Sequence, residues 1–138
     1  ALSYTWGDQD DPDTMELNGH LVPIGRNPAA ALRHLRIQDI WVCLWVDALC
    51  IDQQDDVEKS LQVQRMPIIY EATSFVVIWL GTGFDGVQEA FSWLQDRSNF
   101  IAPPRLSVAE ALTKLLTLPW WRRGWVIQEL TVCQEAVV

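Results

Sequence analysis

The sequence predicts an α/β fold: a flavodoxin-like parallel sheet flanked by helices, with a small β-hairpin near the N-terminus and a helical insertion. Two apolar runs without alternation, residues 40–46 and 75–80, are typical of strands that are covered on both faces. Segments with helical periodicity lie between such strands, as in layered α/β proteins. With 138 residues, 49% of them hydrophobic, the chain is long enough to form one core.

The first elements have clear boundary signals. A short strand is expected at residues 1–4. Residues 15–17 and 20–24 flank Asn18 and Gly19, a dipeptide that suits a two-residue hairpin turn. Asn27 followed by Pro28 then indicates the N-cap of a helix that continues to residue 36.

The second half follows the same logic. A helical period starts at Val57, and Pro67 predicts a kink or a restart within it. After the strand at 75–80 we expect a helical insertion, roughly residues 85–118. Asp85 is expected to cap its first helix, and Ser107 with Glu110 forms a capping box for its second. A helix over 126–132 and a short strand close the chain.

Composition excludes several classes of function. Ten basic and eighteen acidic residues give a net charge of -8, which argues against nucleic-acid and anionic-membrane partners. The longest apolar runs are far below the roughly 18 residues of a membrane span. Cys43, Cys50 and Cys133 form no CxxC pair, which favours a reducing, cytoplasmic location. The eight tryptophans are expected mostly in the core. Because the chain begins at Ala1, we expect a single domain over 1–138 from a longer protein.

Two motifs suggest ligands but match poorly. Gly81, Gly83 and Gly86 form a GxGxxG between a strand and a helix, the context of a dinucleotide-binding fingerprint. A second strand ending in an acid about 20 residues later is missing, so a glycine-rich turn is favoured over an oxidoreductase site. The acidic residues between 8 and 13 lack the glycine and glutamate of a calcium loop, and no metal site is expected.

The position of polar residues along the strands indicates a different site. In open parallel sheets, ligands bind beyond the carboxyl ends of the strands. Tyr4, Trp6 and Asp8 follow the first expected strand, and Asp47 follows the second. The stretch 120–129 could add cations and a carboxylate to the same rim, although its arginines could equally pair with surface acids and its tryptophans could be packed.

Four blocks of sequence resemble the fungal heterokaryon incompatibility (HET) domain. They are residues 1–8, 44–53, 77–81 and 121–130. Single positions that also match are Gln64, Met66, Ile69, Tyr70 and Ala72. The resemblance implies an effector domain that triggers programmed cell death in non-self recognition, controlled by upstream sensor domains elsewhere in the protein.

That family is in turn remotely similar to Toll/interleukin-1 receptor (TIR) domains, some of which cleave NAD. Residues 125–130 resemble the WCxxEL helix whose glutamate is catalytic, which gives that role to Glu129, although Val126 replaces the cysteine. NAD would be a substrate and not a bound cofactor. The implied ligand contacts are Tyr4, Trp6, Asp8, Asp47 and Arg123.

Two questions stay open from sequence. Apolar neighbours surround Glu129, so its carboxylate is either hydrogen-bonded in the core or facing a cavity. The alternative to an enzyme is a signalling module that acts by homotypic self-assembly, as a homo-oligomer.

Overall fold

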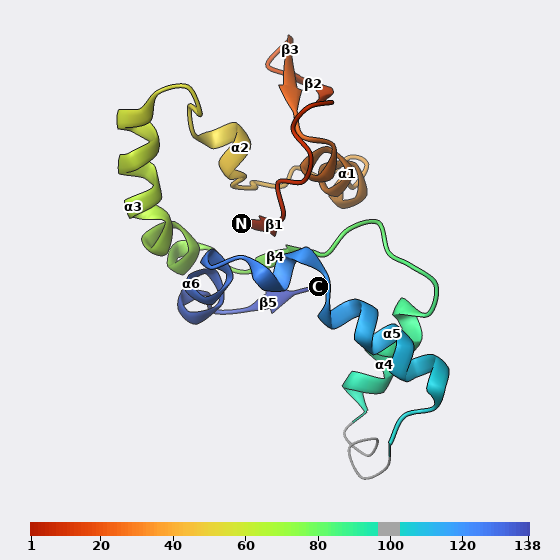
Figure 1. The fold of residues 1–138 in the computed structure, drawn as a ribbon. Helices are drawn as coiled ribbons and strands as arrows, with labels where there is room; N and C mark the ends of the chain where they lie inside the picture. Colours follow the sequence, from red (N-terminus) through yellow and green to blue (C-terminus); the bar gives the residue numbers. More distant parts are fainter. Residues whose placement is uncertain (97–102) are drawn as a thin grey trace. The chain divides into compact units, whose positions relative to one another are not determined.

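The computed structural model describes residues 1–96 and 103–138 (Figure 1). These residues form two compact units. Residues 1–81 and 123–138 make the first, and residues 82–122 make the second. The second unit corresponds to the expected helical insertion, of which residues 97–102 lie outside the described residues. None of the described helices is both long and apolar enough to cross a membrane.

A three-stranded parallel sheet lies at the centre of the first unit, which confirms the predicted fold class. Its order is β1 (Leu2–Tyr4), β4 (Val76–Trp79) and β5 (Ala136–Val137). Leu2 pairs with Val77 and Tyr4 with Trp79, while Val76 pairs with Ala136. The strands expected at both ends of the chain and at 75–80 are therefore present, and chain segments far apart in sequence meet here (Figure 1).

Alternation along β1 sends its side chains to opposite faces of the sheet. All three residues of β1 are buried. Leu2 and Tyr4 pack in one core cluster with Ala31 of α1 (Arg26–Leu35) and with Trp79. Ser3 faces the opposite side, where α6 (Trp125–Val132) lies, because its hydroxyl bonds a side chain of that helix. The short strand β1 thus supplies a tyrosine to one face and a serine to the other.

The predicted hairpin is confirmed. β2 (Asp13–Leu17) and β3 (His20–Ile24) are antiparallel and joined by Asn18 and Gly19. Both turn residues have positive φ, 52° and 81°, as the two-residue turn requires.

The N-cap prediction for the first helix is wrong. Helix α1 starts at Arg26, one residue before Asn27, and its N-cap is Gly25. The Asn27 side chain has a different role: it donates a 2.6 Å hydrogen bond to the Thr5 carbonyl and accepts a 2.9 Å bond from the Trp79 indole. Asn27 therefore ties the ends of β1 and β4 together instead of capping a helix.

The prediction of a strand at residues 40–46 is also wrong. This segment has no regular structure, and a hydrogen bond of 3.0 Å from the Leu2 amide to the Trp45 carbonyl joins its end to the sheet. Val46 is buried, whereas Trp41 is fully exposed. A three-residue β1 offers too short an edge for a seven-residue ladder, so the apolar run follows the sheet only at its end. A four-residue helix, α2 (Asp47–Cys50), begins there.

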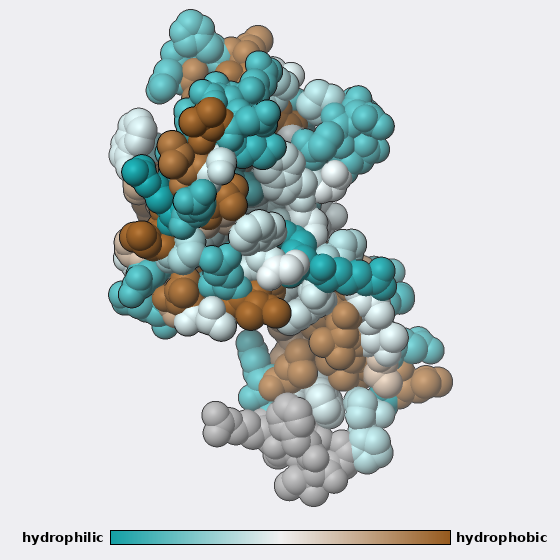
Figure 2. All heavy atoms as spheres, turned by 60° about the vertical axis from the view of Figure 1, so that its left-hand side comes forward, coloured by the Kyte–Doolittle hydropathy of each residue, from teal (hydrophilic) through white to brown (hydrophobic). Residues whose placement is uncertain are grey.

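Helices α3 (Asp56–Ala72) and α6 pack against each other in the first unit. Helix α3 runs through Pro67 without the expected restart. Its N-cap is Asp55, whose carboxylate accepts from two backbone amides of the first turn. On the side of the molecule where these helices lie, hydrophobic side chains are interspersed with hydrophilic ones (Figure 2).

The second unit consists of α4 (Val87–Gln95), α5 (Leu106–Leu116) and the short 3₁₀ helix η2 (Pro119–Arg122). Gly86, and not Asp85, is the N-cap of α4, and Ser107 lies inside the first turn of α5 instead of capping it. Gly86 has φ 88°, and a Cβ there would lie 3.2 Å from the Ala111 Cβ. Tight packing and a left-handed turn explain this glycine without a ligand.

The tryptophans are less buried than expected. Only Trp79 and Trp120 are buried among the described tryptophans. Trp6 and Trp125 are substantially exposed, so these two rings are accessible to a ligand.

Candidate functional site

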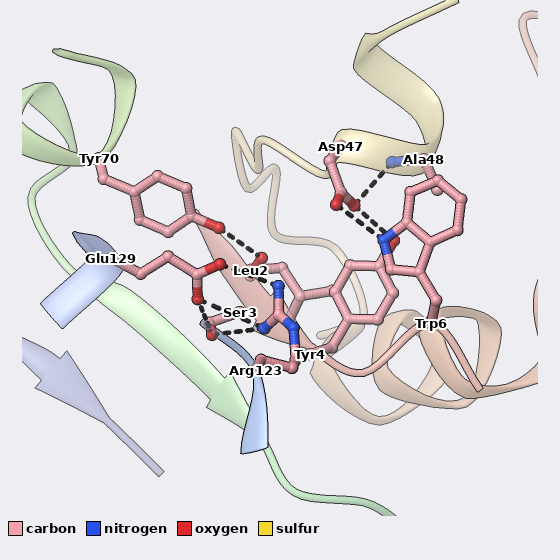
Figure 3. Close-up of polar contacts among 9 residues, drawn as sticks. All are labelled: Leu2, Ser3, Tyr4, Trp6, Asp47, Ala48, Tyr70, Arg123 and Glu129. Atoms are coloured by element: carbon pink, nitrogen blue, oxygen red, sulfur yellow. Dashed lines mark hydrogen bonds and ion pairs between the residues drawn. The ribbon is translucent and has the colours of Figure 1, made fainter. Parts of the chain in front are cut away.

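Asp47 forms the open end of a polar network in the first unit (Figure 3). It follows the buried Val46 and starts α2. Its carboxylate accepts from the Tyr4 hydroxyl at 2.5 Å, the Trp6 indole at 2.9 Å and the Ala48 amide at 2.7 Å. All three donors are neutral, and within the described residues Asp47 forms no salt bridge, so its negative charge is oriented without a direct ion pair there.

Glu129 forms the closed end of the network. Glu129 is only 2% exposed to solvent. The carboxylate accepts from the Ser3 hydroxyl and pairs with Arg123, whose Nη2 lies 2.9 Å from Oε1. Of the two options left open by the sequence, the structure shows a hydrogen-bonded carboxylate in the core. A buried charge of this kind requires its cation, because an unpaired one is very costly.

Arg123 connects the two ends. Its side chain is 17% exposed, and it precedes the first turn of α6. Nη1 lies 3.4 Å from both the Ser3 hydroxyl and Glu129 Oε2. In Figure 3 the guanidinium lies between Glu129 on one side and Tyr4 on the other. One arginine thus holds the buried carboxylate and remains partly accessible.

Two tyrosines border the network and stay protonated. Burial, followed by the negative charge of Asp47, raises the pKa of Tyr4 above its usual value. Burial, followed by the charges of Glu129 and Asp47, raises the pKa of Tyr70 in the same direction. The Tyr70 hydroxyl donates to the Leu2 carbonyl at 3.2 Å. Both hydroxyls therefore act as hydrogen-bond donors at neutral pH.

A cavity of about 330 Å³ opens beside this network. Its walls include Trp6, Asp47, Lys59, Met66, Arg123 and Trp125. Glu129 is not among the described residues that line it, and Arg123 is the residue that both lines the cavity and pairs with Glu129. The cavity therefore offers aromatic faces, one carboxylate and two cations, with a second carboxylate behind an arginine.

The structure brings together five of the six sequence-predicted site residues. Tyr4, Trp6 and Asp47 share hydrogen bonds, and Arg123 with Glu129 completes the group. The sixth, Asp8, lies in an exposed loop, where its carboxylate accepts from the Asp10 amide at 2.9 Å.

Sequence reasoning missed four residues of the site: Ser3, Lys59, Tyr70 and Trp125 in its role as a cavity wall. A serine between two large side chains in a buried strand is a usable signal, because a buried hydroxyl requires a partner. Lys59 had no such signal, since its place on the cavity depends on how α3 packs.

The chain resembles known proteins over nearly its whole length. The sequence model of the family described as heterokaryon incompatibility protein (HET) matches residues 1–129. A protein of Neurospora crassa, "Heterokaryon incompatibility protein 6, OR allele", is 27% identical over 188 aligned residues. The alignment covers 99% of this chain but 28% of that relative, so the chain spans less than a third of its length. No solved structure matches the chain. Because the family match includes most of its residues, this chain belongs to the HET family.

Proposed function

We propose that this chain is an effector domain of fungal non-self recognition that triggers programmed cell death in the cytoplasm by hydrolysing a nicotinamide dinucleotide. Membership of the HET family and similarity to a protein named for heterokaryon incompatibility support the biological role. The observation that carries the chemistry is the Glu129–Arg123 pair directly behind a cavity that Asp47 also lines.

Each wall of the cavity suits one part of such a ligand. The Arg123 guanidinium suits the pyrophosphate, because it can donate two parallel hydrogen bonds to phosphate oxygens. The Asp47 carboxylate, held by Tyr4, suits the ribose hydroxyls, and Asp8 would approach them only by a movement of its loop. Trp6 offers an aromatic face to the nicotinamide ring.

The reaction breaks the bond between ribose C1′ and the nicotinamide nitrogen. The electron pair of that bond goes to the nitrogen, so neutral nicotinamide leaves and the ribose becomes an oxocarbenium-like cation. A nearby carboxylate stabilises this cation, as in glycoside hydrolysis. Water then adds to C1′ and releases a proton to solvent, which gives ADP-ribose.

In this proposal Glu129 is the stabilising carboxylate, and Arg123 controls its access to the ligand. Arg123 lines the cavity and pairs with Glu129, which is not among the described lining residues. When the pyrophosphate attracts the guanidinium, the Glu129 carboxylate loses its cation and faces the developing positive charge of the ribose. The ligand thus supplies the charge that the displaced arginine had supplied.

Release of nicotinamide from NAD by the purified chain tests the proposal. We expect slow release by the parent chain, increased by induced oligomerisation, and loss of at least about 100-fold in the Glu129→Gln variant. Glu135→Gln, an exposed glutamate in the same unit, is the matched control and should leave the rate unchanged. No release by the parent chain, even when oligomerised, would reject the enzymatic proposal.

A second candidate function, homotypic self-assembly, is favoured by a different observation. Ile37, Ile40, Trp41 and Val42 are each more than half exposed, and they line an apolar cavity of about 550 Å³ bounded by α1 and β2. Trp41 alone, fully exposed, presents on the order of 200 Å² of surface. Exposed apolar patches of several hundred Å² are typical of interaction sites, and here the proposed occupant is a second copy of the chain.

Sedimentation separates the two candidates. If assembly is the function, Trp41→Ser abolishes both self-association and cell killing, and Glu129→Gln leaves killing unchanged. A monomeric parent chain at high concentration would reject the assembly candidate.

A further inference from the structure

Lys59 occupies an unusual position on the wall of the cavity. It lies in the first turns of α3 and lines the same cavity as Trp6, Asp47 and Arg123. In the part of the chain that the structure describes, Lys59 has no ion-pair partner. A cation that faces a cavity without a partner is available to an anionic ligand.

Two of the acids near Lys59 in the sequence, Asp55 and Glu58, have other contacts. Asp55 caps α3 through the amides of Val57 and Glu58. The Glu58 carboxylate accepts from the Asp52 amide at 3.2 Å, which directs it toward the preceding loop. These contacts engage two of the carboxylates that lie beside Lys59 in the sequence.

The other cation of the cavity differs from Lys59. Arg123 is already paired with the buried Glu129, so moving it toward a ligand has a cost. Lys59 is exposed and can bind an anion without breaking any ion pair in the described residues. The first contact of an anionic ligand is therefore expected at Lys59.

The size and the aromatic walls of the cavity specify the rest of the ligand. Its volume, about 330 Å³, is near the lower end of the roughly 300–1,000 Å³ typical of small-molecule sites. The rings of Trp6 and Trp125 both reach it. A flat ring, a sugar and a phosphate are the parts that these walls can contact.

We propose that Lys59 is the phosphate-binding residue of this cavity, which selects phosphorylated nucleotides over the corresponding nucleosides. The inference rests on the proposed function for the identity of the ring and sugar, but the anion site itself does not. Lys59 binds the phosphate first, and Arg123 binds the same phosphate once its guanidinium has moved away from Glu129.

Titration of tryptophan fluorescence with three probes tests this proposal: inorganic pyrophosphate, nicotinamide mononucleotide and nicotinamide riboside. Lys59→Gln should weaken binding of the two phosphorylated probes about tenfold and leave the riboside unchanged. Lys59→Arg should keep most of the affinity. Lys114→Gln, which removes the chain's other lysine, is the control for net charge and should have no effect.

Each outcome separates this inference from the proposed function. Pyrophosphate that binds equally to the parent chain and to Lys59→Gln, or binds to neither, overturns the role of Lys59, and nicotinamide release from NAD then still decides the proposed function. Pyrophosphate binding that depends on Lys59, in a chain that releases no nicotinamide, supports the anion site and rejects the hydrolase.

Discussion

The two carboxylates of the site have opposite environments within one network. Glu129 is buried and balanced by Arg123, whereas Asp47 lines the cavity and accepts from neutral donors. Both are reached from β1, because neighbouring residues of a strand point to opposite faces: Ser3 contacts Glu129 and Tyr4 contacts Asp47. A three-residue strand therefore positions both acids.

This difference in environment indicates that the two carboxylates have different roles. A buried, ion-paired carboxylate contributes mainly to stability until its cation moves. A carboxylate on a cavity wall, oriented by neutral hydrogen bonds, keeps its charge available to a ligand.

Removing the cation of the closed end should have the largest effect on stability. Arg123→Met leaves the Glu129 carboxylate buried without a counter-charge, and we expect the free energy of unfolding to fall by about 3–5 kcal/mol. Urea denaturation of the purified chain measures this. The double variant Arg123→Met with Glu129→Met should recover most of the loss, because no buried charge remains. A double variant as unstable as the single one would contradict the paired description.

Asp47→Asn should affect activity far more than stability. The asparagine oxygen can still accept one of the existing hydrogen bonds, so we expect about 1–2 kcal/mol of destabilisation. Loss of the charge that orients the ribose should lower nicotinamide release by about 100-fold. Parallel measurement of urea denaturation and release checks both parts. A variant with full activity would remove Asp47 from the site.

The two tyrosines should make the fold sensitive to alkali. Burial raises the pKa of Tyr4 and of Tyr70 above the unfolded value of about 10, so their contribution to stability is complete below that pH. As pH rises above about 10, each can remove up to about 1.4 kcal/mol per pH unit. The free energy of unfolding, measured between pH 9 and 11, should fall with this slope.

Phenylalanine variants show how much each tyrosine contributes to the fall of the free energy of unfolding at alkaline pH. Tyr70→Phe should reduce the slope and lower activity less than Tyr4→Phe does, since the Tyr70 hydroxyl donates to the Leu2 carbonyl and not to the carboxylate that lines the cavity. Tyr4→Phe should reduce the slope and also weaken activity, because Asp47 loses a donor. Equal effects of both variants on activity would contradict the division between the two ends.

The smallest effect is expected for an ion pair without burial. Arg33 pairs with Asp13 at 2.6 Å near the hairpin, and the arginine side chain is well exposed. Arg33→Met should leave the free energy of unfolding nearly unchanged, because solvent screens an exposed ion pair. A loss as large as that of Arg123→Met would show that burial is not what distinguishes Arg123.

Local signals predicted much of the fold. Asn18 and Gly19 gave the hairpin because positive φ at both positions has few sequence solutions. The apolar run at 75–80 formed the central strand, β4, because partners were available on both edges. The equally apolar run at 40–46 did not form a strand, because strand formation depends on an edge contributed by distant residues.

The site was only partly predictable for the same reason. Tyr4, Trp6 and Asp47 follow from the rule that polar groups gather beyond strand ends. Lys59 depends on the packing of α3, and the burial of Glu129 depends on Ser3 on a strand 126 residues away. Tertiary contacts of this kind leave little trace in a single sequence.

The most direct test of the account is a structure of the Glu129→Gln variant with NAD bound. In that complex we expect the pyrophosphate in contact with Lys59 and Arg123, the Arg123 guanidinium withdrawn from residue 129, and the side chain of residue 129 facing the ribose. An NAD molecule bound in this cavity with Arg123 still held against residue 129, or bound elsewhere on the chain, would contradict it.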